Sequence, residues 1–284
     1  MTRQWHPVFA HLLRPVVEGH YEVRTNVPVG DAPREADIVL LRRTSRGRPP
    51  FTGLWRGLTM WNVLEYKGPT VSARVADIDL LVELGLGIHR RLNEERERQG
   101  QPPLGAGEVS FWYLANHLGR RFLRDCQGPL GPLEEHGRGV WRCRVLGRVV
   151  FLVSGADLPV EEDTLPLHVL AREPQETERE VAEFVVQRPK LWEEYAGWLG
   201  MLHANAFAEV EAMAKTKGGR LDFEIEPLIR VFGIEQVVDK LGPARLAEQL
   251  KKKRFLSQLS PETCRELIEL LRQQAESTTE PPPQ

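Results

Sequence analysis

The sequence predicts a mixed α/β fold in its first part and an all-helical region after it. Up to about residue 155, segments with apolar residues every three or four positions alternate with segments of two-residue periodicity and short apolar runs. After residue 176, the helical periodicity dominates. The 284 residues are 41% hydrophobic and 27% charged, proportions that exclude a wholly disordered chain. We therefore expect a mixed central sheet flanked by helices, followed by a helical C-terminal region.

The first predicted elements are one helix and three strands. Residues 7–18 carry an apolar helical stripe that ends before Gly19. Residues 21–27 alternate in the manner of a strand, and residues 37–41 form a short apolar run after a turn at Pro33. Residues 42–56 are rich in Gly and Pro and predict a loop. The apolar and aromatic residues 58–66, stopped by Gly68 and Pro69, predict a central strand.

The next predicted elements complete the α/β part. Ser72 is a suitable N-cap for a helix that runs to about residue 97, although Gly85 and Gly87 weaken its middle. Residues 109–114 predict a fourth strand, and residues 116–126 a helix. Residues 139–146 and 148–153 predict a hairpin. The expected order is helix, three strands, helix, strand, helix and two strands.

The remaining sequence predicts helices over residues 177–214, with an interruption at Pro189, and over residues 221–250 and 261–274. We divide the chain into residues 1–170, residues 171–274 and a disordered tail at 275–284. Gly233 and Gly242 open two nine-residue units, which could form a helix-turn-helix. Most helical hairpins with a glycine turn bind no DNA, and the basic run at 251–254 is typical of a solvated helix end.

Charge is unevenly distributed along the chain, whose formal net charge is −2. Residues 1–150 contain 22 Lys+Arg and 16 Asp+Glu, whereas residues 151–284 contain 16 and 24. The basic residues of the first half are nearly all arginines, whose planar guanidinium matches the geometry of a phosphate. A polyanionic partner for the first half and ordinary solvated faces are both consistent with this pattern.

The sequence lacks the features of a disulfide-rich secreted protein and of a membrane protein. Three widely spaced cysteines argue against a disulfide scaffold and a cysteine zinc site. No stretch has the roughly 20 apolar residues that a membrane span requires, and no signal peptide is apparent. We expect a cytoplasmic protein with no membrane partner.

The residues best suited to chemistry lie on the second and third predicted strands. Strand alternation puts Glu65 and Lys67 on one side of the third strand, and Asp37 opens the second. Two carboxylates are hard oxygen ligands of the kind that Mg²⁺ prefers, and a metal-bound water is a stronger nucleophile. A neighbouring lysine can orient that water or stabilise charge on a phosphate. These are the components of metal-assisted phosphodiester hydrolysis.

The sequence resembles the motif of the PD-(D/E)XK nuclease superfamily at Ala36-Asp37 and, with Glu65 28 residues after Asp37, at Glu65-Tyr66-Lys67. The predicted order of one helix, three strands, one helix and one strand also matches the core of that superfamily. The resemblance covers about residues 7–155 and implies a restriction-endonuclease-like core. Ala36 replaces the family's usual proline, which is not a ligand. With its helical C-terminal region, the chain looks most like the recombination-promoting nuclease or putative-transposase branch.

The resemblance also implies roles for individual residues. Asp37 and Glu65 would bind Mg²⁺ or Mn²⁺, the backbone carbonyl of Tyr66 would join them, and Lys67 would be the catalytic lysine. Many members add a glutamate from the first helix, for which Glu18 is the first candidate and Glu22 the second. The implied activity is endonucleolytic hydrolysis of DNA. Because cutting both strands takes two sites, a homodimer is compatible with this activity.

Arginines are the candidates for contacting the DNA backbone: Arg74, which follows the motif, and Arg42 and Arg43 in the predicted loop. An ordinary surface role is the alternative for Arg74. Trp55 and Trp61 could stack on bases, although Trp61 is better explained as core. We expect Asp77 and Asp79, on the second helix, to be solvated, although the resemblance implies that the helix after the motif often borders the site.

Two alternative interpretations of Asp37, Glu65 and Lys67 are also consistent with the sequence. About one Glu-x-Lys triplet is expected by chance in such a sequence, so Glu65 and Lys67 could be an ion pair on an edge strand, with Asp37 a turn residue. Alternatively, the chain is a catalytically silent nuclease fold that acts as a protein-interaction or regulatory module through its acidic C-terminal helices.

Overall fold

A computed structural model describes residues 5–25, 27–28, 35–36, 38–45, 47, 49–171, 174–215, 225–242, 246 and 260–277. The chain divides into two compact units, residues 1–172 and 173–284. Within the described ranges, no helix combines the length and the apolar character that crossing a membrane would require.

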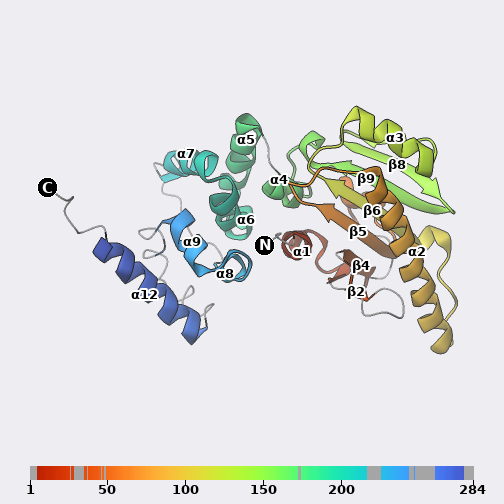
Figure 1. Ribbon diagram of the computed structural model, residues 1–284, viewed down its shortest axis with the longest axis horizontal. Coiled ribbons are helices and arrows are strands. Elements are labelled where there is room, and N and C mark those ends of the chain that lie inside the picture. The colour runs from red at the N-terminus through yellow and green to blue at the C-terminus, as the bar shows by residue number, and fades with distance from the viewer. Residues whose placement is uncertain are drawn as a thin grey trace. The chain divides into compact units, whose positions relative to one another are not determined.

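The first unit is built on a seven-stranded mixed sheet (Figure 1). β5 is antiparallel to β4 and parallel to β6, which is in turn parallel to β9; the remaining neighbours pair antiparallel. A separate two-stranded sheet pairs β2 (Val27–Pro28) with β3 (Glu35–Ala36). The strands of the large sheet, in spatial order, are β1 (Tyr21–Arg24), β4 (Val39–Arg43), β5 (Trp61–Lys67), β6 (Val109–Ala115), β9 (Arg148–Ser154), β8 (Val140–Val145) and β7 (Glu134–Gly137).

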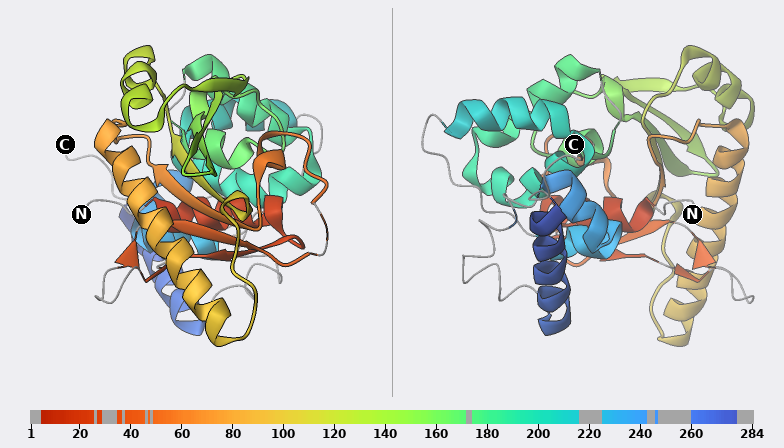
Figure 2. Two further views of the ribbon diagram at one scale, coloured as in Figure 1. Left: turned by 90° about the vertical axis from the view of Figure 1, so that its right-hand side faces the viewer. Right: turned by 60° about the vertical axis from the view of Figure 1, so that its left-hand side comes forward.

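Helices cover both faces of this sheet. α2 (Val75–Arg98) and α3 (Arg120–Leu130) pack on one face, where Val63 and Phe111 of the sheet meet Ile78 of α2 in a buried apolar core. Figure 2 shows α2 lying along the sheet. α1 (His6–Val17) packs on the other face, with Phe9 stacked on Tyr66, and α4 (Leu165–Leu170) lies beside α1. Short 3₁₀ turns are η1 (Leu54–Gly57), η2 (Ala106–Glu108) and η3 (Gly155–Asp157).

The hairpin of β8 and β9 has a two-residue turn. Val145 pairs with Arg148, and the residues between them, Leu146 and Gly147, both have positive φ, at 48° and 79°. Such a turn matches the twist of the flanking strands, and glycine adopts its second position without strain. The exposed Leu146 accepts an unusual conformation because the pairing on both sides fixes it.

The second unit is helical. Its helices pack around aromatic pairs, with Trp192 stacked on Phe207 and Trp198 tilted against Phe232. α6 begins at Pro189, the position of the expected interruption, because proline is tolerated at the first turn of a helix. The described helices are α5 (Gln175–Val186), α6 (Pro189–Leu202), α7 (Ala204–Lys215), α8 (Glu226–Phe232), α9 (Ile234–Leu241) and α12 (Pro261–Ser277).

The prediction of an α/β fold with a mixed sheet between helices is confirmed. Several boundaries differ from expectation. Arg42 and Arg43 belong to β4 rather than to a loop, because both pair with β1. α3 begins at Arg120, and β7 lies in a segment whose polar sequence gave no strand signal. Residues 275–277 of the expected tail at 275–284 belong to the last turn of α12, which ends at Ser277. The rest of that tail and most of residues 243–259, including the basic run, fall outside the described residues.

Candidate functional site

Lys67, the last residue of β5, is the one lysine of the first unit in a sequence that otherwise uses arginine there. The next lysine along the chain is Lys190, and residues 1–172 contain 22 arginines. Arginine therefore supplies the general positive charge of this unit. A lysine offers something different, a compact ammonium group with three donors.

Glu65 contacts Lys67 directly. The two residues share the face of β5 that α2 covers, and the Lys67 Nζ lies 2.8 Å from the Glu65 Oε1. Their side chains are 17% and 11% exposed. Because β5 is the third of seven strands, this is an interior strand, and the alternative of an ion pair on an edge strand does not describe it.

Asp77 brings a second carboxylate to the same ammonium group. Its Oδ1 lies 3.5 Å from the Lys67 Nζ, and the side chain is 6% exposed. The expectation that Asp77 is solvated was therefore wrong, whereas Asp79 is exposed as expected. Asp77 occupies the first turn of α2, which packs over β5 and β6, so its side chain turns inward while that of Asp79 turns outward.

Tyr113 of β6 completes a buried group that we call the Lys67 cluster, made of Glu65, Lys67, Asp77 and Tyr113. Tyr113 lies opposite Glu65 in the parallel register, and its hydroxyl donates to the Asp77 Oδ2 over 3.1 Å. Sequence reasoning missed Tyr113, because a tyrosine on a buried strand gives no signal until the pairing of β5 with β6 is known.

The electrostatics of the Lys67 cluster keep its two donors protonated. Burial by itself would lower the pKa of Lys67, but the hydrogen bond to Glu65 and the charges of Glu65 and Asp77 outweigh it, so that the pKa is raised. Burial and the nearby Asp77 carboxylate raise the pKa of Tyr113. Lys67 is thus suited to stabilising negative charge, and not to acting as a general base at neutral pH.

Arg74 lies at the solvent edge of the Lys67 cluster. It is the N-cap of α2, its backbone N–H donates to the Asp77 Oδ2 over 3.1 Å, and its guanidinium lies 3.4 Å from the Asp77 Oδ1. The side chain is 73% exposed. Arg74 can therefore contact a solvent-borne ligand that approaches Lys67.

Asp37 lies outside the described residues. Its neighbours along the chain are described: β4 begins at Val39, which pairs with Leu64, the residue before Glu65. The chain thus enters β4 at the end of the sheet where the Lys67 cluster lies. Tyr66 points its side chain to the opposite face, where the ring stacks on Phe9 with centroids 4.9 Å apart.

The structure does not bring Glu18 or Glu22 to the Lys67 cluster. The beginning of α1 lies at the Lys67 end of β5, since a Cβ on Gly68 would be 2.1 Å from Trp5. Glu18 follows the other end of this 12-residue helix, about 18 Å away. Glu22 lies on the edge strand β1, where it pairs with Arg24 at 2.8 Å. Both were chosen because the resemblance implies a glutamate from the first helix, but Glu18 follows the far end of α1 and Glu22 lies on β1.

Arg42 and Arg43 do not form one surface. They are adjacent on β4 and therefore face opposite sides of the sheet. Arg42 lies on the α2 side, with its guanidinium 5.6 Å from the ring centre of Trp61, and Arg43 lines a pocket on the other side. Trp61 and Trp55 are both buried, so neither presents a ring for base stacking.

The donor set of the Lys67 cluster fits a hard divalent cation in part. Glu65 offers carboxylate oxygens, which Mg²⁺ and Mn²⁺ prefer, whereas Asp77 is engaged by Lys67, Arg74 and Tyr113. Across the part of the chain that the structure describes, no group of three or more His, Cys, Asp or Glu side chains is arranged to hold a metal ion. Mg²⁺ takes few protein ligands and retains water, and Asp37 and a backbone carbonyl are the candidates for further ligands.

No protein-family model, curated protein or solved structure matches this chain.

Proposed function

We propose that this chain is a divalent-metal-dependent endonuclease of the PD-(D/E)XK type that hydrolyses DNA phosphodiester bonds. The observation that carries the proposal is the position of Glu65 and Lys67, paired at the end of an interior strand and joined there by Asp77. A buried lysine between two carboxylates is costly to maintain for stability alone, since packed apolar residues would serve at least as well.

The order and direction of the elements support the same proposal. α1, β1, β4, β5, α2 and β6 follow one another as the helix, three strands, helix and strand of the superfamily core, apart from the small β2–β3 ribbon between β1 and β4. β4 runs antiparallel to both of its neighbours, and β5 runs parallel to β6. The motif residues Glu65 and Lys67 stand at the C-terminal end of the third strand of this core.

In the proposed site, Asp37, Glu65 and the Tyr66 carbonyl would hold Mg²⁺ or Mn²⁺. The ion would supply a water of lowered pKa and neutralise charge on the phosphate. Lys67 remains protonated and donates to the charge that develops on the phosphate oxygens. Asp77, hydrogen-bonded by Tyr113, fixes the position of the Lys67 ammonium, and Arg74 contacts a flanking phosphate.

Plasmid cleavage tests this function. Supercoiled DNA incubated with the protein and Mg²⁺ or Mn²⁺ should be cut, and Lys67→Ala should lose at least about 100-fold in rate, the scale of removing a transition-state donor. Lys190→Ala, which removes an exposed lysine of the other unit, is the matched control and should cut normally. Cutting by Lys67→Ala at the wild-type rate would show that Lys67 is not catalytic.

A catalytically silent interaction module is the second candidate. It is favoured by the closed pairing of Lys67, whose ammonium is already in contact with both described carboxylates. Calorimetric titration with Mn²⁺ separates the two functions, because the silent module should bind no metal and cut no DNA. Deletion of residues 176–284 should then abolish capture of a protein partner, if the acidic helices provide the interaction surface.

A further inference from the structure

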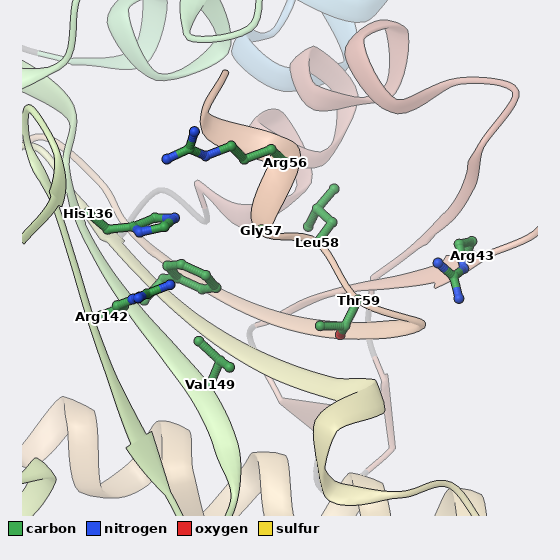
Figure 3. A pocket seen from close by; sticks show the side chains of 9 residues that line it. Arg43, Arg56, Gly57, Leu58, Thr59, His136, Arg142 and Val149 are labelled. Carbon is green, nitrogen blue, oxygen red and sulfur yellow. The ribbon is translucent and has the colours of Figure 1, made fainter. Parts of the chain in front are cut away.

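A basic pocket of about 570 Å³ lies on the opposite face of the sheet from the Lys67 cluster (Figure 3). Val150 and Leu152 of β9 point into the α2 side of the sheet, so Val149 and Phe151, which line the pocket, point the other way. The residues that line it are Arg43, Arg56, Gly57, Leu58, Thr59, His136, Arg142, Val149 and Phe151. The pocket is thus separate from the proposed nuclease site.

The charge of the lining has one sign. Three arginines and a histidine contribute side chains, and no carboxylate lines the pocket. Figure 3 shows Arg56, His136 and Arg142 at one end and Arg43 at the other. Burial and the charges of Arg142 and Arg56 lower the pKa of His136, and the nearby Glu134 opposes that shift. Gathering like charges is unfavourable, and Glu134, which lies outside the lining, pairs with Arg142.

Two of the arginines retain unused hydrogen-bonding capacity. The Arg142 Nε donates to Glu134 over 3.0 Å, and within the described ranges its other guanidinium nitrogens make no hydrogen bond. That pair is half exposed and weak, so an anion can compete for it. The Arg43 Nε is buried and has no hydrogen-bond partner among the described residues. A buried donor of this kind is costly, and a ligand would contact the remaining nitrogens of the Arg43 guanidinium.

The size of the pocket and its apolar lining residues restrict the class of ligand that it can bind. The volume lies within the range of small-molecule sites and far exceeds what a single phosphate ion fills. Leu58, Val149 and Phe151 supply an apolar surface between the two basic ends. The Thr59 hydroxyl donates to the Trp61 carbonyl over 2.8 Å, and the charged groups of the lining are Arg43, Arg56 and Arg142. A matching molecule carries an anionic group at one end and, at the other, a body that is partly apolar and bears hydrogen-bond acceptors.

We propose that this pocket binds a nucleoside phosphate, with the phosphate between Arg56, His136 and Arg142 and acceptors of the base directed to Arg43. Guanidinium groups form paired hydrogen bonds to phosphate, and the base provides the flat body and the acceptors. The proposal does not depend on the nuclease activity, because it uses none of the residues of the Lys67 cluster.

Calorimetric titration of the full chain with AMP in EDTA tests the proposal, since EDTA removes metal-dependent binding at the Lys67 cluster. AMP should bind, and Arg56→Ala and Arg142→Ala should each weaken binding by about 10-fold or more, the scale of a lost charged hydrogen bond. Arg144→Ala is the matched control, because Arg144 lies on the same strand and face as Arg142 but outside the pocket lining. It should bind AMP as the wild type does.

Two further ligands make the result specific. Adenosine, which lacks the phosphate, should bind at least 10-fold more weakly than AMP, and inorganic phosphate should compete with AMP only weakly. Inorganic phosphate binding as tightly as AMP would overturn the assignment to a nucleotide. No heat of binding with millimolar AMP, or equal AMP binding by the Arg56, Arg142 and Arg144 variants, would overturn the site itself. Lys67→Ala should bind AMP normally, which separates this outcome from that of the nuclease test.

Discussion

At the scale of single residues, the Lys67 cluster is an ion network whose members depend on one another. Lys67 lies between Glu65 and Asp77, and Tyr113 donates to Asp77. Removing one carboxylate leaves the other to pair with the ammonium. Removing the ammonium leaves two carboxylates facing each other in a buried site, which is the larger perturbation.

We expect Lys67→Met to lower the free energy of unfolding by about 3 kcal/mol at pH 7, as the loss of one partner of a buried ion pair does. The folded-state pKa of Lys67 is raised above its ordinary value of 10.5, so its stabilising contribution is present below that value and is lost as the pH rises through the raised pKa. In urea unfolding, the difference in free energy of unfolding between the wild type and Lys67→Met should therefore be constant from pH 6 to 9.

The control for this measurement is Lys190→Met, at an exposed position, which should change stability by less than about 0.5 kcal/mol. If the stability difference between the wild type and Lys67→Met disappeared by pH 8, the Lys67 ammonium would lose its proton near neutrality, contrary to its raised pKa.

At the scale of elements, the contact between α2 and the sheet positions Asp77. Gly85, in the middle of α2, is buried, and a Cβ at this position would be 2.4 Å from the ring of Phe111 on β6. Although glycine has a low helix propensity, Gly85 therefore lets α2 approach β6 closely. This approach keeps the first turn of α2 over the end of β5.

Gly85→Ala should destabilise the protein by about 1–3 kcal/mol, because overpacking against Phe111 outweighs the gain in helix propensity. Gly128→Ala is the matched substitution, since Gly128 lies in α3 with open space where the Cβ would be. It should be neutral or stabilise by up to about 1 kcal/mol. Thermal unfolding followed by circular dichroism distinguishes them, and a more stable Gly85→Ala would contradict close packing here.

At the scale of the whole molecule, the net charge of each unit differs from that of the two sequence halves. Residues 1–172 contain 23 Lys+Arg and 20 Asp+Glu, a net charge of +3, and residues 173–284 have −5. The asymmetry is smaller than that of the two sequence halves, because residues 151–172, which belong to the first unit, add four carboxylates and one arginine. An excess of three charges favours local contacts, at Arg74 or in the basic pocket, over broad electrostatic attraction to DNA.

We predict that residues 1–172 fold on their own. This unit contains the whole sheet, the apolar core under α2 and α3, and the helices of the other face. The isolated unit should unfold in one cooperative transition in urea, with dispersed amide signals in NMR spectra. A spectrum typical of an unfolded chain would show that the second unit is required for folding.

Sequence patterns predicted the order of most elements and the shared face of Glu65 and Lys67, because strand and helix periodicities act within a few residues. They could not place Asp77 or Tyr113, which join the cluster only through the packing of α2 and the parallel pairing of β6 with β5. The resemblance suggested Glu18 as a ligand, but the direction of α1 across the sheet, which the sequence does not give, puts Glu18 at the far end of the helix.

Local sequence patterns were sufficient to predict a mixed sheet between helices, a helical second part, and one lysine beside a carboxylate on a central strand. The packing of the folded chain was needed to show that a second buried carboxylate and a tyrosine meet at this site, and that Arg43 joins Arg56, His136 and Arg142 around a pocket on the opposite face. The physical reason is that periodicity fixes which side of its own element a residue faces. Which residues of different elements meet is set by strand pairing and helix packing over the whole core.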